Sequence, residues 1–256
     1  MELSGTSAIV TGGASGIGAA SARALTKRGA RCVLIDLNDE LGDALASELS
    51  GLYVKADVAD PEAVQAAVDA ASEMAPLRAA VNAAGIGAAS RTVDREGNPH
   101  PLELFEKVIR VNLIGTFNCL RLAAAAMAKT DPVDADGTRG AIVNISSVAS
   151  FDGQIGQAAY SASKGGINSL TLTTARDLSA QGIRVNTITP GLIDTPIYGT
   201  GERADAFKAK LGESVLFPHR LGTADELASM VVELITNDYM NGEVIRVDGG
   251  IRMPPK

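Results

Sequence analysis

The sequence predicts one α/β domain spanning residues 1–256, with a doubly wound parallel sheet of seven strands flanked by helices. Short runs of β-branched and other apolar residues recur along the chain, and helical patterns separate them. Most of these runs are continuous rather than alternating, which is typical of strands that helices bury on both faces. Crossover helices between such strands produce a doubly wound sheet. We find no linker or internal repeat that would divide the chain.

The expected strands and helices alternate along the whole chain. Two helix starts are well signalled, because Asp60 precedes Pro61 and because Thr223 and Glu226 have capping-box spacing. The strands are expected at residues 7–10, 31–35, 52–54, 79–81, 141–145, 184–188 and 244–247. The helices are expected at residues 16–28, 39–49, 61–74, 102–129, 157–180 and 223–235.

Two segments interrupt this regular pattern. Residues 88–101 are polar and contain one glycine and two prolines, and residues 191–218 are longer and include a short amphipathic stretch. Both follow strands, and ligands of open α/β sheets bind beyond the carboxyl ends of the strands. We therefore expect both segments to flank a ligand crevice, with residues 191–218 forming a substrate loop that closes over the ligand.

Composition excludes several classes of protein. The chain has a formal net charge of -7, with 46% hydrophobic and 21% charged residues. This supports a sizeable core, and no run of Lys or Arg offers the basic face that a nucleic-acid binder needs. No apolar run approaches the roughly 20 residues that span a membrane, and the first ten residues are too polar for a signal peptide. We expect no nucleic-acid partner, no membrane association and a cytoplasmic location.

Cysteines and histidines are few. Cys32 and Cys119 lie in apolar stretches, which indicates buried thiols in a reducing compartment rather than a disulfide. His100 and His219 have no acidic or thiol partners at metal-ligand spacing. We therefore expect no metal site.

A glycine-rich loop joins the first expected strand to the first expected helix. Glycines permit a tight turn and close approach of the backbone to a pyrophosphate, and the helix N-terminus offers free N–H groups to it. A glycine cluster alone could be an ordinary turn, but this placement favours a Rossmann-type dinucleotide site. The loop runs from Thr11 to Gly18, and its candidate cofactor contacts are Gly12, Ser15, Gly16, Ile17 and Gly18.

The second expected strand ends at Asp36. An acidic residue at this place accepts hydrogen bonds from the adenosine ribose and repels a 2′-phosphate. No Lys or Arg follows at once, because the next residues are Leu37, Asn38 and Asp39. The sequence therefore predicts NAD rather than NADP as the cofactor.

Three further residues form a candidate catalytic group. Ser147 follows the fifth expected strand, and Tyr160 and Lys164 are four residues apart, which places them on one face of a helix. A phenol has a pKa of about 10 and is a poor base at neutral pH. A nearby ammonium group favours the phenolate, so Lys164 is expected to lower the pKa of Tyr160 toward working pH. The pair alone could be a surface Tyr and Lys, but with Ser147 and the phosphate loop it indicates catalysis.

Together these motifs resemble the short-chain dehydrogenase/reductase family over essentially the whole chain. They include residues 11–18, the sequence Asn-Ala-Ala-Gly at 82–85, Asn112, the Ser147–Tyr160–Lys164 group and Pro190-Gly191. The resemblance implies that Tyr160 is the acid/base, that Ser147 binds the substrate oxygen and that Lys164 binds the nicotinamide ribose. It also implies that Asn112 holds a water that connects Lys164 to solvent.

The resemblance adds contacts for the rest of the cofactor. Asp57 and Val58 are expected to bracket the adenine, and residues 82–85 to line the cleft. Ile193 and Thr195, which follow the Pro190-Gly191 turn, are expected to contact the nicotinamide carboxamide. The additional cofactor-binding residues are therefore Asp57, Val58, Asn82, Ala83, Gly85, Pro190, Ile193 and Thr195, beside Tyr160 and Lys164.

Three longer stretches, at residues 151–160, 217–222 and 241–253, resemble one subgroup, the type II 3-hydroxyacyl-CoA dehydrogenases, also described as type 10 17β-hydroxysteroid dehydrogenases. This resemblance implies NAD-dependent interconversion of 3-hydroxyacyl-CoA and 3-oxoacyl-CoA in fatty acid metabolism, by a homotetramer. Residues 88–101 match a longer loop of the subgroup that makes room for acyl-CoA. Gln154 is a further candidate substrate contact, beside Ser147 and Tyr160, whereas Asp152 is expected to be a solvated loop acid.

Other functions remain open on the sequence. A 3-oxoacyl carrier-protein reductase or a hydroxysteroid dehydrogenase would use the same catalytic group, although a reductase of fatty-acid synthesis usually takes NADP, which Asp36 disfavours. A dinucleotide-binding regulatory or scaffold protein is the alternative that is not an enzyme, and such proteins usually lack the tyrosine or the lysine.

Overall fold

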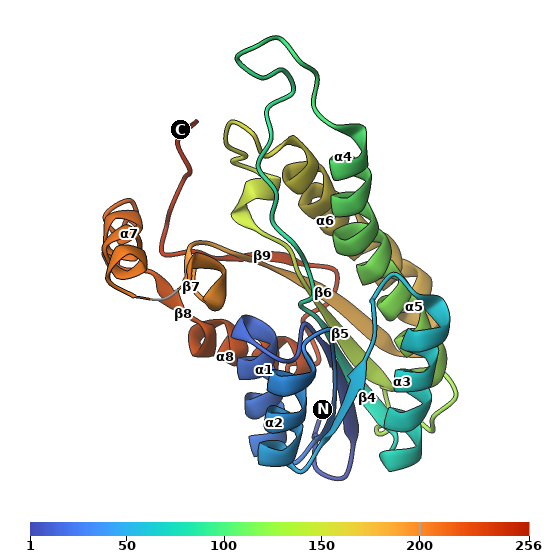
Figure 1. Ribbon diagram of the computed structural model, residues 1–256. Coiled ribbons are helices and arrows are strands. Elements are labelled where there is room, and N and C mark those ends of the chain that lie inside the picture. Colours follow the sequence, from blue (N-terminus) through green and yellow to red (C-terminus); the bar gives the residue numbers. More distant parts are fainter. Residues whose placement is uncertain (200, 256) are drawn as a thin grey trace.

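The computed structural model describes residues 1–199 and 201–255, and within them seven parallel strands form one sheet. The sheet has the order β3-β2-β1-β4-β5-β6-β9, which reverses direction between β1 and β4. This confirms the predicted doubly wound α/β fold (Figure 1). The strands are β1 Ser7–Thr11, β2 Arg31–Asp36, β3 Leu52–Lys55, β4 Leu77–Asn82, β5 Gly140–Ile145, β6 Ile183–Pro190 and β9 Val244–Val247.

Helices cover both faces of the sheet (Figure 1). One layer contains α1 Gly16–Lys27, α2 Asp39–Leu49 and α8 Ala224–Thr236. The other contains α3 Pro61–Met74, α4 Leu102–Ile109, α5 Gly115–Met127 and α6 Ala158–Leu178. Both predicted helix starts are confirmed, because the Asp60 carboxylate accepts from the first-turn amides of α3 and because Thr223 and Glu226 form a capping box on α8.

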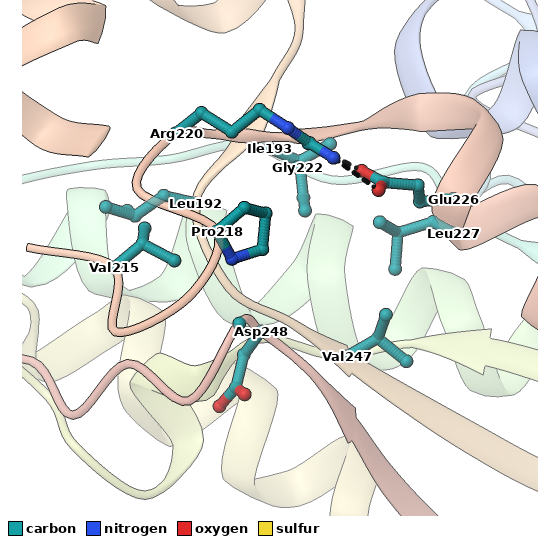
Figure 2. Close-up of a pocket in the computed structure, with 11 residues that line it drawn as sticks. Leu192, Ile193, Val215, Pro218, Arg220, Gly222, Glu226, Leu227, Val247 and Asp248 are labelled. Carbon is teal, nitrogen blue, oxygen red and sulfur yellow. Dashed lines mark hydrogen bonds and ion pairs between the residues drawn. The ribbon is translucent and has the colours of Figure 1, made fainter. Parts of the chain in front are cut away.

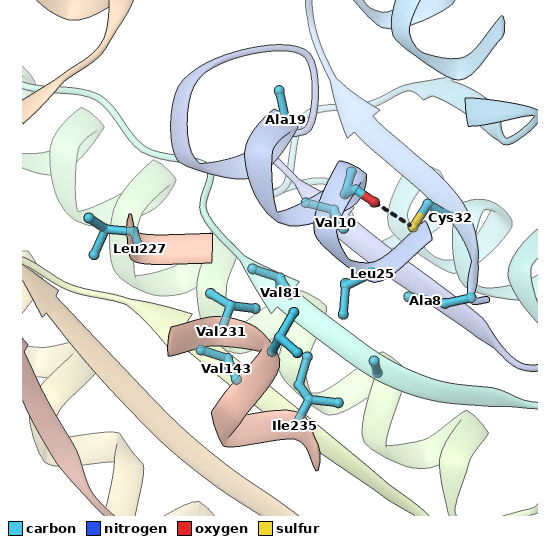
Figure 3. Close-up of a cluster of buried hydrophobic side chains, with 14 of the residues drawn as sticks. Ala8, Val10, Ala19, Leu25, Cys32, Val81, Val143, Leu227, Val231 and Ile235 are labelled. Atoms are coloured by element: carbon cyan, nitrogen blue, oxygen red, sulfur yellow. Dashed lines mark hydrogen bonds between the residues drawn. The ribbon is translucent and has the colours of Figure 1, made fainter. Parts of the chain in front are cut away.

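The core lies in two layers because successive strand residues point to opposite faces. On β1, Ala8 and Val10 pack toward α1 and α8, whereas Ile9 packs toward α3 and α5. Figure 3 shows the first layer, in which Leu25 of α1 and Val231 of α8 meet the strand side chains. Strands buried on both sides explain why the apolar runs in the sequence are continuous.

Three features differ from the sequence prediction. The helix expected at 102–129 is interrupted by a π-helical turn, Arg110–Ile114, which separates α4 from α5. The substrate loop contains the helix α7, Glu202–Gly212, and also contributes one strand to a two-stranded sheet that the sequence did not signal. This small sheet pairs β7, Ile193–Asp194, with β8, Gly222–Thr223. Its strands are too short for an apolar period to mark them.

Among the described residues, one helix has the length and composition of a membrane span. It runs from Leu102 to Met127 through the π turn, with a mean hydropathy of 1.2. Its most apolar stretch is 56% buried inside the protein, where it packs on α3 and α6. A helix buried to this extent is typical of the core of a fold.

Candidate active site

The phosphate loop is closed by two contacts that only glycine allows. Gly12 has φ +61°, and a Cβ there would lie 2.9 Å from the backbone of Ala83. A Cβ on Gly18 would lie 2.1 Å from the carbonyl oxygen of Gly12. The loop therefore folds back on itself beside the end of β4, and the first turn of α1 follows it directly.

The N-terminus of α1 lies beside the segment that follows β6. Ser15 is the extended N-cap residue, and its side chain makes no cap hydrogen bond. The first amides of a helix have no intrahelical partner and favour an anion. A Cβ on Gly16 would lie 3.3 Å from the methyl carbon of Thr195, so the structure brings the segment after β6 to the phosphate loop.

Asp36 stands at the carboxyl end of β2 and is held by backbone groups. Its carboxylate accepts hydrogen bonds from the amides of Ala14 at 3.0 Å, Leu37 at 2.7 Å and Asn38 at 3.1 Å. The bond to Ala14 ties the acid to the phosphate loop. Lys55 lies beside Asp36 in the sheet register, but its ammonium pairs with Asp39. The charge at the carboxyl end of β2 is therefore that of Asp36.

The two residues predicted beside the adenine differ in exposure. Asp57 is exposed and its carboxylate accepts from the amide of Ala59 at 2.9 Å. The Val58 side chain is buried against α5, where a Cβ on Gly115 would meet it, and its carbonyl accepts from Asn118. Only the backbone of Val58 therefore remains for the cleft.

The Asn-Ala-Ala-Gly segment is fastened to the first strand by Thr11, whose role the sequence analysis missed. The Thr11 hydroxyl accepts from the amides of Ala83 and Ala84, each at 3.1 Å. Asn82 is buried and donates to the Asn144 side-chain oxygen at 2.9 Å. Thr11 was visible at the end of β1, but its partners are more than 70 residues away.

The three candidate catalytic residues come together from β5 and α6. Ser147 is the extended residue before a short 3-10 turn, Val148–Ser150, and its hydroxyl accepts from the Ala149 amide at 3.2 Å. Tyr160 lies in the first turn of α6, half-buried. Lys164 lies one turn later, with its Nζ 5.8 Å from the centre of the Tyr160 ring. This confirms that the spacing places Tyr160 and Lys164 on one face.

Lys164 is almost completely buried. Its Nζ donates to the carbonyl of Ile145 at 2.9 Å. Burial lowers the pKa of Lys164 from 10.5 to about 8, so the side chain remains mostly charged at pH 7. The ammonium is thus held between the end of β5 and α6.

The pKa of Tyr160 corrects one expectation. Burial raises the pKa of Tyr160 above the ordinary value of a phenol, and the Ser147 side chain lowers it in part. The expected net lowering of the Tyr160 pKa is therefore wrong for this geometry, in which the effect of burial dominates and the Lys164 ammonium donates to the Ile145 carbonyl, 5.8 Å from the ring centre.

Asn112 occupies the π turn between α4 and α5. Its amide accepts from the Ile86 N–H at 2.8 Å and donates to the Ile86 carbonyl and to Ser163, both at 3.0 Å. A Cβ on Gly85 would lie 3.2 Å from the Asn112 oxygen and 3.5 Å from the Lys164 Nζ. Asn112 therefore holds the segment after β4 against α6, and its water-relay role stays a prediction.

The remaining predicted contacts lie around the end of β6. Pro190 is buried at the strand end, and the Ile193 side chain packs into the core while Ile193 pairs with Gly222 in the small sheet. Tyr198, which the sequence analysis did not single out, lies in the substrate loop close to Tyr160. Burial raises the pKa of Tyr198, and Tyr160 adds to this shift.

Two residues of the loop before Tyr160, Gln154 and Asp152, have side-chain partners that the sequence analysis did not expect. The Gln154 side chain donates to the Pro254 carbonyl at 3.0 Å, so it contacts the C-terminal segment. Asp152 is not a solvated acid, because it pairs with Arg246 at 2.8 Å with one fifth of its side chain exposed. The sequence could not reveal these partners, which lie more than 90 residues away.

A small pocket of about 130 Å³ lies between α8, the end of β9 and the segment that follows β6 (Figure 2). Leu192 and Ile193 line it from one side and Leu227 of α8 from another, and Arg220 and Glu226 join across its edge by two hydrogen bonds of 2.9 and 2.8 Å.

In the described residues no group of three or more His, Cys, Asp or Glu side chains is placed to hold a metal ion.

Comparison with known proteins agrees with this geometry. The profile of the short chain dehydrogenase family matches residues 6–205. The chain belongs to the short-chain dehydrogenase family. It is therefore an oxidoreductase.

The chain is similar over its full length to proteins named 3-hydroxyacyl-CoA dehydrogenase type-2. It is 49% identical to the protein of that name from Bos taurus, over 99% of this chain and 98% of the relative. It is 47% identical to the one from Drosophila melanogaster, over 96% of this chain and 97% of the relative. The crystal structure of 3-hydroxyacyl-CoA dehydrogenase type-2 from Mycobacterium avium matches with a TM-score of 0.94 and 46% identity, covering 100% of this chain and 99% of that chain.

Proposed function

We propose that this protein is an NAD-dependent dehydrogenase that interconverts 3-hydroxyacyl-CoA and 3-oxoacyl-CoA in fatty acid metabolism. The observation that carries the substrate class is the 49% identity, over 99% of the chain, to a protein named for that activity. The geometry of Ser147, Tyr160 and Lys164 supports the reaction type, which is oxidation of a secondary alcohol.

The residues of the cleft fit NAD. The glycine turn against Ala83 and the open N-terminus of α1 suit the pyrophosphate, and the anchored Asp36 carboxylate suits two ribose hydroxyls and disfavours a 2′-phosphate. Lys164 would reach the nicotinamide ribose from the floor of the cleft. Bound NAD would supply the hydride acceptor and the positive charge of its nicotinamide ring.

The side chains of this protein would bind the substrate oxygen and accept the proton of the substrate hydroxyl. The Ser147 hydroxyl would hydrogen-bond the substrate oxygen and hold it against Tyr160, which as phenolate would accept the hydroxyl proton. Because burial raises the pKa of Tyr160, the phenolate needs positive charge nearby. Lys164 is the charge that this chain places one helical turn away.

We also propose a homotetramer in the cytoplasm. Helix α4, the π turn and α5 together expose several large apolar side chains, and exposed apolar side chains are typical of subunit contacts. The residues are Leu102, Ile114 and Phe117, with Leu172 on the neighbouring α6. Both cysteines are free and buried, which supports a reducing compartment.

The test follows the formation of NADH or NADPH at 340 nm with purified protein. NAD and NADP are each combined with 3-hydroxybutyryl-CoA, 3-hydroxy-2-methylbutyryl-CoA, a longer 3-hydroxyacyl-CoA and a 17β-hydroxysteroid. Turnover of the CoA esters with a clear preference for NAD is the expected result. Turnover of the steroid alone, or a preference for NADP, would overturn the proposed substrate or cofactor.

A hydroxysteroid is the second candidate substrate. The chain is 36% identical to 3-alpha-(or 20-beta)-hydroxysteroid dehydrogenase of Mycobacterium bovis, over 97% of this chain and 90% of the relative. Because this identity is lower than the 49% to the protein named for the CoA esters, a hydroxysteroid is the less favoured substrate. The substrate panel described above distinguishes the two.

A further inference from the structure

Arg246 connects the C-terminal segment to the loop that carries Ser147 and leads to Tyr160. Its Nη2 donates to the Asp152 carboxylate at 2.8 Å and to the Ile251 carbonyl at 2.8 Å, and its Nε donates to Asp248 at 2.6 Å. Only about a fifth of the Arg246 and Asp152 side chains is exposed, at 21% and 20%. The guanidinium group thus bridges two carboxylates from different parts of the chain.

The surroundings hold this bridge in one geometry. The Phe151 ring lies 5.4 Å from the guanidinium carbon, and the Asp248 carboxylate also accepts from the Gly250 amide at 2.9 Å. Figure 2 shows the Asp248 carboxylate directed away from the other residues of the pocket. Charge-assisted bonds to a planar guanidinium are directional, so the bridge specifies position as well as attraction.

The C-terminal segment touches the same loop at two more points. The Gln154 side chain and the Ile155 amide donate to the carbonyls of Pro254 and Pro255, each at 3.0 Å. The segment also meets the end of the substrate loop, where the Phe217 amide donates to the Gly249 carbonyl at 3.0 Å. A small apolar cluster packs these three parts together, formed by Val148, Val215 and Ile251 with Leu192 and Met253.

The other side of the loop is fixed to α6. Asn168 donates to the Ser150 hydroxyl at 2.7 Å, and that hydroxyl donates to the Ser147 carbonyl at 2.6 Å. The Asp152 amide donates to the Val148 carbonyl at 2.9 Å. A displacement of Asp152 is therefore passed through one short turn to Ser147.

We propose that Arg246 is a positioning residue for the reaction, acting through Asp152 to set Ser147 relative to Tyr160. The bridge ties the loop to the C-terminal segment, and that segment also contacts the end of the substrate loop. This inference rests on the Ser147 and Tyr160 chemistry proposed above, and it holds for whichever secondary alcohol the protein oxidises.

The sharpest variant is Asp152→Asn. It removes the negative charge that Asp152 contributes to the bridge. Arg246 keeps its hydrogen bonds to Asp248 and to the Ile251 carbonyl, so folding is expected to be retained. Displacement of a reacting group by about 1 Å costs about a hundredfold in rate, and a smaller shift is expected to lower kcat about tenfold. Because the slowed step is the chemical one, the deuterium isotope effect on kcat should rise with substrate deuterated at the carbinol carbon.

Arg246→Met removes the whole bridge and is expected to lower kcat further, by about ten- to a hundredfold. Arg252→Met is the matched control. Arg252 contacts the same Asp248 at 3.3 Å, but its side chain is 64% exposed and it makes no contact with Asp152 in the described residues. Its kcat should stay within about twofold of wild type.

Binding of NADH, measured by fluorescence titration, separates positioning from general damage. The inference is supported if kcat falls in both bridge variants, the isotope effect rises and the NADH dissociation constant stays within about twofold. An unchanged kcat in Asp152→Asn, or a loss matched by weaker NADH binding without a larger isotope effect, would overturn it. Wild-type protein that turns over none of the alcohols would instead refute the proposed function.

Discussion

Replacing Lys164 with methionine is expected to stabilise the protein at pH 7 while abolishing its activity. Lys164 is only 4% exposed, and its charge is therefore held in a poorly hydrated place. Burial lowers its pKa from 10.5 to about 8, so the folded protein binds this proton less tightly than the unfolded chain does. Below pH 8 the buried charge opposes folding, and between pH 8 and 10.5 that opposition disappears.

The magnitude follows from the two pKa values. Each pH unit between them corresponds to about 1.4 kcal/mol, so the charge costs the folded state about 3 kcal/mol at pH 7 and about 2 kcal/mol at pH 9. Methionine also loses the hydrogen bond to the Ile145 carbonyl, which is worth about 1 kcal/mol. The variant should therefore be more stable than wild type by about 2 kcal/mol at pH 7 and by about 1 kcal/mol at pH 9.

The assay is urea unfolding followed by circular dichroism, at pH 7 and pH 9 and at one protein concentration. Lys129→Met is the control, because Lys129 is exposed and its replacement should change the unfolding free energy by less than about 0.5 kcal/mol. A Lys164→Met protein that is less stable than wild type at pH 7 would refute the reasoning. So would a stability difference that stays the same at both pH values.

Three further variants test other parts of the site. Tyr160→Phe should lower kcat by about 10²–10⁴-fold, because the acid/base is lost; an NADH titration should show little change, and retained turnover would exclude the role. Asp36→Asn keeps an acceptor for the Ala14 amide but removes the charge, so the ratio of kcat/KM for NAD to that for NADP should fall about tenfold or more. If that ratio is unchanged, Asp36 does not select the cofactor. Gly18→Ala should weaken NADH binding by at least about tenfold, because its Cβ would lie 2.1 Å from the Gly12 oxygen. Wild-type affinity would show that the phosphate loop does not bind the dinucleotide.

Local chemistry in the sequence was enough for most of the fold. The bounds of α2, α3 and β9 agree with the predicted ranges, and the other six strands of the large sheet begin and end within two residues of them. Continuous apolar runs report burial on both faces, and caps such as Asp60 report helix starts, so these elements needed no distant partner. The sequence likewise placed Asp36 at a strand end and put Tyr160 and Lys164 on one helical face.

Only the tertiary structure decided what surrounds those residues. The π turn at Asn112 exists where the side chain can satisfy Ile86 and Ser163, which belong to other elements. The raised pKa of Tyr160 comes from burial, which no local spacing reports. Asp152 finds Arg246 94 residues away. Hydrogen bonds and desolvation depend on atoms brought together by folding, so the sequence named the reacting groups and the packing determined their positions and charges.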